Sequence, residues 1–212
     1  MGLIARQLLG LAVGAVAMTG LSLAASAGVI DFEGSFYSEG DNLAGTTGNL
    51  ITGSSITFGV TVAQPSSGSN AGTALIFNTQ SLPPGSNDTD LLQPFDDPTT
   101  PGNDNFDPGN ILVIGNNNGK IDDDADGGTI TFTFSEAVNF LSVDLFDTGD
   151  GNQSPGVSNS VDITLLDAGG GTVGEFLNVG ANLNDREFST FTLSGIGNFA
   201  PVDCIQRKRF SR

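Results

Sequence analysis

Short runs of alternating apolar and polar residues are the main pattern of this sequence. The clearest run is Thr129–Phe134, where three threonines alternate with Ile130, Phe132 and Phe134. Successive side chains of a strand point to opposite faces of a sheet, so these three apolar residues are predicted to face a core. The same alternation recurs in residues 56–62 and is typical of strands with one buried face.

About ten segments have the length and composition of strands, and none shows a sustained helical period. They are residues 29–32, 56–62, 73–78, 110–114, 129–134, 138–147, 161–166, 172–177, 188–193 and 199–205. The sequence Asp-Ala-Gly-Gly-Gly at 167–171 predicts a hairpin between two of them. The pattern predicts an all-β fold, an antiparallel two-sheet sandwich of the jelly-roll type. Residues 81–109, rich in Pro, Asp, Asn, Gly and Thr, are expected to form a long acidic loop on its surface.

The N-terminal segment has the order of parts that defines a secretory signal peptide. Arg6 precedes an apolar run, and the small residues of Ala25-Ser26-Ala27 follow it. We therefore predict residues 1–27 to be a signal peptide cleaved after Ala27, residues 28–206 to be one domain, and 207–212 to be a basic tail. The alternative, a membrane anchor, is disfavoured because glycines interrupt the apolar run and its core is shorter than the roughly 20 residues that cross a bilayer. No other stretch suggests a membrane span.

Charge narrows the range of partners. The formal net charge is −17, and all 24 acidic residues follow residue 27. Between residues 28 and 206 only Lys120 and Arg186 are positive. Such a surface repels nucleic acid and attracts cations, although solubility alone would also explain the acidity. Cys204 is the single cysteine, so no intrachain disulfide can form; it is interpreted as a small buried residue, with cross-linking of two chains as the alternative.

The acidic residues suggest two calcium sites. Asp122, Asp124 and Asp126 alternate and are followed by Gly127, which is how a loop can wrap oxygen ligands around Ca²⁺. Thr133 stands where a helix-loop-helix site needs glutamate, so only a loop between strands remains possible. The alternative is a solvated acidic turn.

The second candidate calcium site brings the ends of the domain together. Asp31 and Glu33 on the first predicted strand could meet Asp203 on the last. Sandwich modules that bind sugars often hold a structural calcium ion between their terminal strands. If these strands pair without a metal, like charges would lie close together, which is unfavourable unless the side chains turn to water.

The residue types in this sequence give little support to a catalytic function. The chain has no histidine, which excludes a Ser-His-Asp triad and a histidine-held zinc site. A carboxylate-dependent glycoside hydrolase needs only two acids, but no glutamate pair stands out on a single predicted strand. Sugar binding also lacks tryptophan and has one tyrosine. Most phenylalanines lie at predicted core positions, and a glycan would be sought at the loop residues Phe95, Asp96, Asp97, Phe106 and Asp107.

Several segments resemble the PEP-CTERM group of exported proteins from Gram-negative, exopolysaccharide-producing bacteria. These segments are Val29-Ile30-Asp31-Phe32-Glu33-Gly34, residues 73–78, 109–114, 122–132 and 143–147. The resemblance implies a β-sandwich at the cell surface or in the matrix, attached through a C-terminal Pro-Glu-Pro sorting signal. That signal is not in this sequence, and we interpret residues 207–212 as a truncated or frame-shifted end.

Our leading hypothesis from the sequence is a non-enzymatic secreted or cell-surface β-sandwich. It would be a component of the extracellular matrix or associated with exopolysaccharide, with calcium as a stabilising ion. The alternatives are a carbohydrate-binding module and a carboxylate-dependent glycoside hydrolase. The expected partners are cations and extracellular polysaccharide, not nucleic acid.

Overall fold

The computed structural model describes residues 28–33, 36–63, 72–84, 86, 89–99, 105–115, 121, 128–138, 142–148, 160–180, 183, 186–192 and 203–209. Within these ranges the regular structure consists of strands, with no α-helix. The strands are β1 (Asn49–Leu50), β2 (Thr57–Ala63), β3 (Thr73–Asn78), β4 (Asn110–Gly115), β5 (Thr129–Phe134), β6 (Ser142–Phe146), β7 (Ser160–Leu166), β8 (Thr172–Val179), β9 (Phe188–Thr192) and β10 (Asp203–Arg209).

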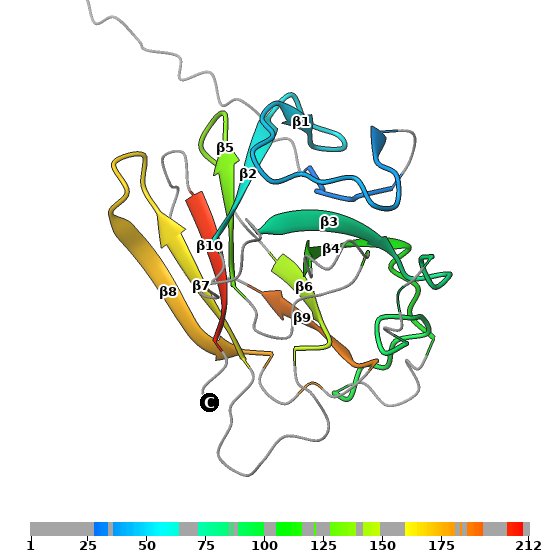
Figure 1. Ribbon diagram of the computed structural model, residues 1–212. Coiled ribbons are helices and arrows are strands. Elements are labelled where there is room, and N and C mark those ends of the chain that lie inside the picture. Colours follow the sequence, from blue (N-terminus) through cyan, green and yellow to red (C-terminus); the bar gives the residue numbers. More distant parts are fainter. Residues whose placement is uncertain are drawn as a thin grey trace, which may run out of the picture.

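The strands form one large sheet and two small ones. The large sheet has six strands in the order β1-β2-β5-β10-β7-β8 (Figure 1), and the pairs β3-β4 and β6-β9 form the two-stranded sheets. Every pair of neighbouring named strands is antiparallel. The prediction of an all-β, antiparallel fold is confirmed.

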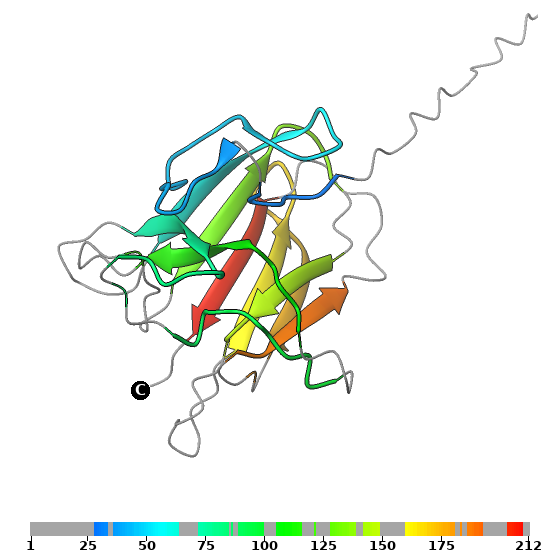
Figure 2. The same ribbon diagram turned by 90° about the vertical axis from the view of Figure 1, so that its right-hand side faces the viewer.

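The main apolar cluster lies between the large sheet and the small sheets. Figures 1 and 2 show both small sheets on the same side of the six-stranded sheet. The cluster joins Phe58 and Val60 of β2 with Ile76 of β3, Leu145 of β6 and Ile163 of β7. All five side chains are 2% exposed or less. Burial of each such side chain contributes about 1.5–3 kcal/mol, so this cluster makes a large contribution to stability.

The alternating apolar residues of the predicted strands are buried, as expected. On β5, Ile130 and Phe134 are buried, Phe132 packs partly buried against the same core, and Thr133 is exposed. On β7, Val161, Ile163 and Leu165 are each no more than 2% exposed. One face of each strand therefore supplies the core, as a period of two residues requires.

A smaller apolar cluster corrects the prediction for residues 81–109. Leu91 of this segment packs with Phe77 of β3 and with Ile111 and Val113 of β4. Phe95 is 0% exposed. The segment was expected to be a surface loop because its composition is polar. Its described part instead contributes apolar anchors to the interior, so it is a packed part of the fold.

The ends of the domain also differ from expectation. Residues 29–32 do not form a strand, since Val29 makes a single antiparallel bridge to Thr52. The last strand begins at Asp203 and runs to Arg209, so it crosses the predicted boundary between domain and basic tail. It lies inside the large sheet between β5 and β7. The predicted tail therefore supplies backbone to the sheet.

The predicted hairpin at residues 167–171 is confirmed, and a single carboxylate holds it. The Asp167 Oδ1 atom accepts hydrogen bonds from the backbone N–H groups of Gly169 and Gly171, each at 2.8 Å. The backbone N–H of Asp167 donates to the Gly171 carbonyl at 2.8 Å, and Gly170 has a φ of 80°. A left-handed φ favours glycine, so both side chain and backbone chemistry specify this turn.

Replacing Asp167 with alanine is expected to lower the free energy of unfolding by about 1–2 kcal/mol, because two N–H groups lose a charged acceptor. Urea denaturation followed by circular dichroism measures this change. Asp167→Asn is the matched control, because its amide keeps one acceptor oxygen, and it should lose less stability than the alanine variant. Equal losses in the two variants would contradict the role assigned to the carboxylate.

Candidate functional site

The first predicted calcium site, Asp122, Asp124 and Asp126, lies outside the described residues. Only its neighbours are placed. Ile121 lies against Gly40, where an added Cβ would come within 2.9 Å of the Ile121 Cδ1 atom, and Gly128 precedes β5. Among the residues that are described, no three acidic or cysteine side chains come together as a metal site. The site at residues 122–126 stays a prediction.

The second predicted site is only partly described. A carboxylate oxygen of Glu33 accepts a hydrogen bond from the backbone N–H of Asn110, and the Asn110 side chain donates to the Phe32 carbonyl at 2.9 Å. Asp31 accepts a hydrogen bond from the Glu33 backbone N–H at 3.2 Å. The segment is thus fastened to the start of β4, whereas Asp203 pairs with Thr133 of β5. A calcium ion shared by Asp31, Glu33 and Asp203 stays a prediction.

Tyr37 reports on the surroundings of Asp31. Burial raises the pKa of Tyr37 above its ordinary value of 10.0, and the negative charge of Asp31 raises it further. Its ring packs edge-on against Phe32, with a centroid distance of 5.8 Å. A raised pKa means that the fold favours the neutral phenol. This contribution to stability is present below pH 10 and is lost as the pH rises through the folded-state pKa.

We expect the phenolate absorbance of the native protein to appear with a midpoint above pH 10.0. Tyr37 is the only tyrosine and there is no tryptophan, so the signal has one source. Asp31→Asn should lower the midpoint without returning it to the unfolded value, because burial is the larger cause. Glu175→Gln, an exposed charge change on β8, should leave the midpoint unchanged. A native midpoint equal to that in denaturant would refute the assignment.

The two loop aromatics predicted to contact a glycan form a packed phenylalanine cluster. Phe95 and Phe106 pair through two backbone hydrogen bonds of 3.0 and 3.1 Å. The Phe95 ring lies 5.0 Å from that of Phe146, and the Phe106 ring stacks on that of Phe188 at 4.4 Å. Because Phe95 is fully buried, it has no exposed ring face. The prediction that Phe95 is an exposed binding aromatic is wrong, and Phe106 is half-buried in the same cluster.

The three loop aspartates have separate structural contacts. The backbone of Asp96 forms a parallel bridge to Glu187, immediately before β9. Asp97 accepts hydrogen bonds from the backbone N–H and the hydroxyl of Thr99 at 2.9 and 2.7 Å. Asp107 accepts one from the Gly109 N–H at 2.9 Å. Of these three contacts, the Asp96 bridge joins the loop to the start of β9, and the other two form turns within the loop. Pro98 and Thr99 lie beside residues of β8 and β9.

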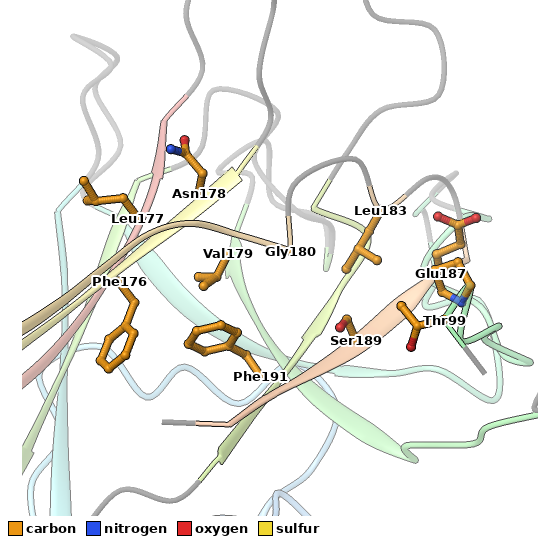
Figure 3. Close-up of a pocket in the computed structure, with 11 residues that line it drawn as sticks. Thr99, Phe176, Leu177, Asn178, Val179, Gly180, Leu183, Glu187, Ser189 and Phe191 are labelled. Atoms are coloured by element: carbon orange, nitrogen blue, oxygen red, sulfur yellow. The ribbon is translucent and has the colours of Figure 1, made fainter. Parts of the chain in front are cut away.

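A hollow with a volume of about 620 Å³ lies between β8 and β9. Its residues come from β8, β9, the turn after β8, and the loop (Figure 3). They are Pro98, Thr99, Phe176, Leu177, Asn178, Val179, Gly180, Leu183, Glu187, Ser189 and Phe191. β8 is the last strand of the large sheet and β9 belongs to the small sheet β6-β9. The hollow therefore opens at the edge of the space between the sheets.

A β-bulge in β8 shapes one wall of the hollow. Val161 pairs with Val179 and Ile163 pairs with Phe176, so Leu177 and Asn178 together stand opposite the single residue Asp162. Asn178 has a φ of 58°, and its backbone N–H donates to the Asp162 Oδ1 atom at 3.0 Å. Asparagine tolerates this left-handed conformation better than most residues. A bulge redirects side chains, and here Phe176 and Val179 lie on the side of β8 that faces Phe191 (Figure 3).

The lining divides into an apolar part and a polar part. Phe176 and Phe191 meet edge to face with ring centroids 5.5 Å apart, and Val179 lies beside them (Figure 3). Ser189, Thr99 and Glu187 supply two hydroxyls and a carboxylate toward the other end. The sequence predicted strands at residues 172–177 and 188–193, which overlap β8 and β9. The bulge, and with it the hollow, depends on φ at Asn178, for which an asparagine after Leu177 is the only sequence signal.

Comparisons with known proteins found no relative of this chain. No family model, no curated protein and no solved structure matches the chain. In the part of the chain that the structure describes, no helix has the length and apolar character needed to cross a membrane. The predicted cleavage residues Ala25 and Ala27 lie outside that part.

Proposed function

We propose that this chain is a non-enzymatic secreted or cell-surface protein whose domain is a two-layered, jelly-roll-like β-sandwich. It would serve as a component of the extracellular matrix or of the exopolysaccharide layer of a Gram-negative bacterium, as its resemblance to PEP-CTERM proteins implies. The signal peptide of residues 1–27 would export it. In this proposal its acidic residues have structural and cation-binding roles.

The observation that carries the proposal is how the carboxylates are used. Asp31, Asp41, Asp97, Asp107 and Asp167 each accept a hydrogen bond from a backbone N–H two or three residues away. Such local bonds fix turns. Carboxylates that act in general acid and base catalysis are instead grouped and held in surroundings that shift their pKa. In the part of the chain that the structure describes, these five aspartates lie one to a turn, and this favours a structural domain.

Calcium is the proposed stabilising ion. Carboxylate oxygens are the ligands that Ca²⁺ prefers, and one bound to a backbone N–H keeps further lone pairs for a cation. A net charge of −17 also draws cations to the surface. The predicted loop at Asp122, Asp124 and Asp126 would hold the ion.

Millimolar calcium should raise the melting temperature of the purified exported chain, and a chelator should lower it again. An ion present at about 100 times its dissociation constant adds about 2.7 kcal/mol, which corresponds to a shift of roughly 5–10 °C. A triple variant, Asp122→Asn, Asp124→Asn and Asp126→Asn, should lose the calcium response. Magnesium at the same concentration controls for general screening. An unchanged midpoint in the unaltered chain would remove calcium from the proposal.

Cell fractionation tests the location. The chain should be recovered outside the cytoplasm with Gly28 as its first residue, and a variant lacking residues 1–27 should remain inside. Digestion of the matrix polysaccharide should release the exported chain if it is held there. Recovery of the complete chain from the cytoplasm, with Met1 or Gly2 at its start, would overturn the proposed function.

A further inference from the structure

The peptide bond between Asp107 and Pro108 lies in a turn that the Asp107 carboxylate closes. Its Oδ1 atom accepts a hydrogen bond of 2.9 Å from the backbone N–H of Gly109. The ring closed by this hydrogen bond contains the carboxylate carbon, the Asp107 carbonyl carbon and the Pro108 nitrogen. The last two atoms are the two ends of the peptide bond. The side chain is therefore folded back toward the bond that follows it.

An Asp-Pro bond is open to attack by its own side chain for two chemical reasons. A carboxyl oxygen of aspartate can reach the carbonyl carbon of the same residue through a small, unstrained ring. Proline supplies a tertiary amide nitrogen, which is more basic than the nitrogen of other peptide bonds and leaves more readily as an amine. Both the attacking group and the leaving group are thus present at residues 107 and 108.

Neighbouring side chains fix the turn in place. The Gly109 carbonyl accepts hydrogen bonds from the backbone N–H and the hydroxyl of Thr79, at 2.9 and 2.7 Å. Gln80 donates through Nε2 to the Asp107 Oδ2 atom at 3.2 Å. Gln93, with its amide nitrogen turned toward Asp107, donates to the same carboxylate. Asp107 is still exposed, so water reaches the turn.

A second carboxylate lies beside the turn. The Glu33 carboxylate lies against Gly109 and accepts a hydrogen bond from the backbone N–H of Asn110. The groups that donate to Asp107 from Gln80 and Gln93 are neutral amides. The titratable side chains that these contacts place at the turn are therefore Asp107 and Glu33, and acid makes both of them neutral.

We propose that the folded chain cuts itself between Asp107 and Pro108 in acid. The protonated Asp107 carboxyl adds through one oxygen to its own carbonyl carbon, and its proton passes to the Pro108 nitrogen. The bond from the carbonyl carbon to that nitrogen breaks, which leaves a cyclic anhydride at residue 107 and a secondary amine at residue 108. Water then opens the anhydride to two carboxylic acids. The net reaction is hydrolysis of one bond, once in each chain.

The fold is expected to speed this reaction. In an unfolded chain the Asp107 side chain samples several staggered rotamers, whereas the native turn holds one that is folded toward the bond. Orientation of reacting groups in advance lowers the barrier. Restriction of one torsion angle to a single rotamer predicts cleavage about threefold faster in the folded chain than in the unfolded chain.

The cut chain is expected to stay assembled. The cut leaves β3 on one fragment and β4 on the other, and these two strands are paired along their whole length. The pair β2 and β5 also joins the two fragments. The domain would become two chains in one fold. This inference goes beyond the proposed function and does not depend on where the chain is located.

The purified exported chain tests the proposal, at the lowest pH at which circular dichroism shows it folded. All samples carry Asp97→Asn, which removes the other Asp-Pro bond. Mass spectrometry of samples kept in buffer and in urea at the same pH measures the fragments that end at Asp107 and begin at Pro108. The rate in buffer should exceed the rate in urea about threefold. The two fragments should separate on a denaturing gel and elute together under native conditions.

Three variants identify the groups involved. Asp107→Asn keeps an acceptor oxygen for the Gly109 N–H but has no carboxyl proton to transfer, so it should remain uncut over the same period. Pro108→Ala replaces the tertiary amide and should be cut about tenfold more slowly or less. Glu33→Gln should be cut at the unaltered rate, because Glu33 takes no part in the ring.

Three outcomes would overturn the inference. They are no cut at residue 107 in the folded chain, a rate in urea equal to or above that in buffer, and cutting of the Asp107→Asn variant at the unaltered rate. The comparison of buffer with urea uses one protein, so it decides the result even if a variant fails to fold.

Discussion

Replacement of Phe95 by alanine is expected to lower the free energy of unfolding by about 3–5 kcal/mol, the range for removing a fully buried phenylalanine. Phe95 is 0% exposed, and its ring packs edge-on against Phe146. Its backbone also pairs with Phe106, whose ring stacks on Phe188. The substitution therefore opens a cavity where the loop joins the β6-β9 sheet. Guanidinium denaturation measures the loss.

Phe36→Ala is the matched control for this prediction. Phe36 is 70% exposed, so its removal should change the free energy of unfolding by no more than about 0.5 kcal/mol. Limited proteolysis adds a second readout, since the Phe95 variant should be cut within residues 81–109 well before the control. Equal stability of the two variants would mean that the loop does not contribute to the core.

Replacement of Gly109 by alanine is expected to lower the free energy of unfolding by about 2–3 kcal/mol. Gly109 has a φ of +68°, and a left-handed conformation costs a residue with a Cβ about 1–2 kcal/mol. The new Cβ would also overlap the Glu33 carboxylate. Glu33 would have to move, which breaks its hydrogen bond to the Asn110 N–H at a further cost of about 1 kcal/mol.

A double-mutant cycle with Glu33→Ala separates the two causes. In the Glu33→Ala background the overlap is absent, so Gly109→Ala should retain only the backbone cost of about 1–2 kcal/mol. Chemical denaturation of the four proteins gives the coupling energy. If the cost of Gly109→Ala is the same in both backgrounds, the contact between Glu33 and residue 109 has no energetic consequence.

The central strands could be predicted from the sequence because their pattern is local. Alternation of Ile130, Phe132 and Phe134, and of Val161, Ile163 and Leu165, follows directly from a sheet with one buried face. The hairpin at Asp167 could also be predicted, because one aspartate and three glycines, residue types that favour turns, lie within five residues. In these elements, short-range preference and long-range packing agree.

The loop and the hollow could not be predicted because they depend on contacts between segments distant in sequence. Phe95 lies among polar residues, and its burial arises from Phe146 and Phe188 on other strands. The side of β8 that Phe176 occupies depends on the bulge at Asn178, which exists only in the pairing with β7. These segments are polar and rich in turn residues, as their composition indicates. Composition does not indicate which of their apolar residues come into contact in the folded chain.

The position of β10 has a consequence for when the protein can fold. β10 is the last described strand along the chain, yet it lies between β5 and β7 in the interior of the large sheet. Until it arrives, β5 and β7 have no partner on their facing edges, so the sheet remains in two separate halves. Pairing between distant segments is slow and comes late in folding. The halves β1-β2-β5 and β7-β8 would therefore join into one sheet only after residues 203–209 have been synthesised, so closure of the large sheet is expected to be the last step of its assembly.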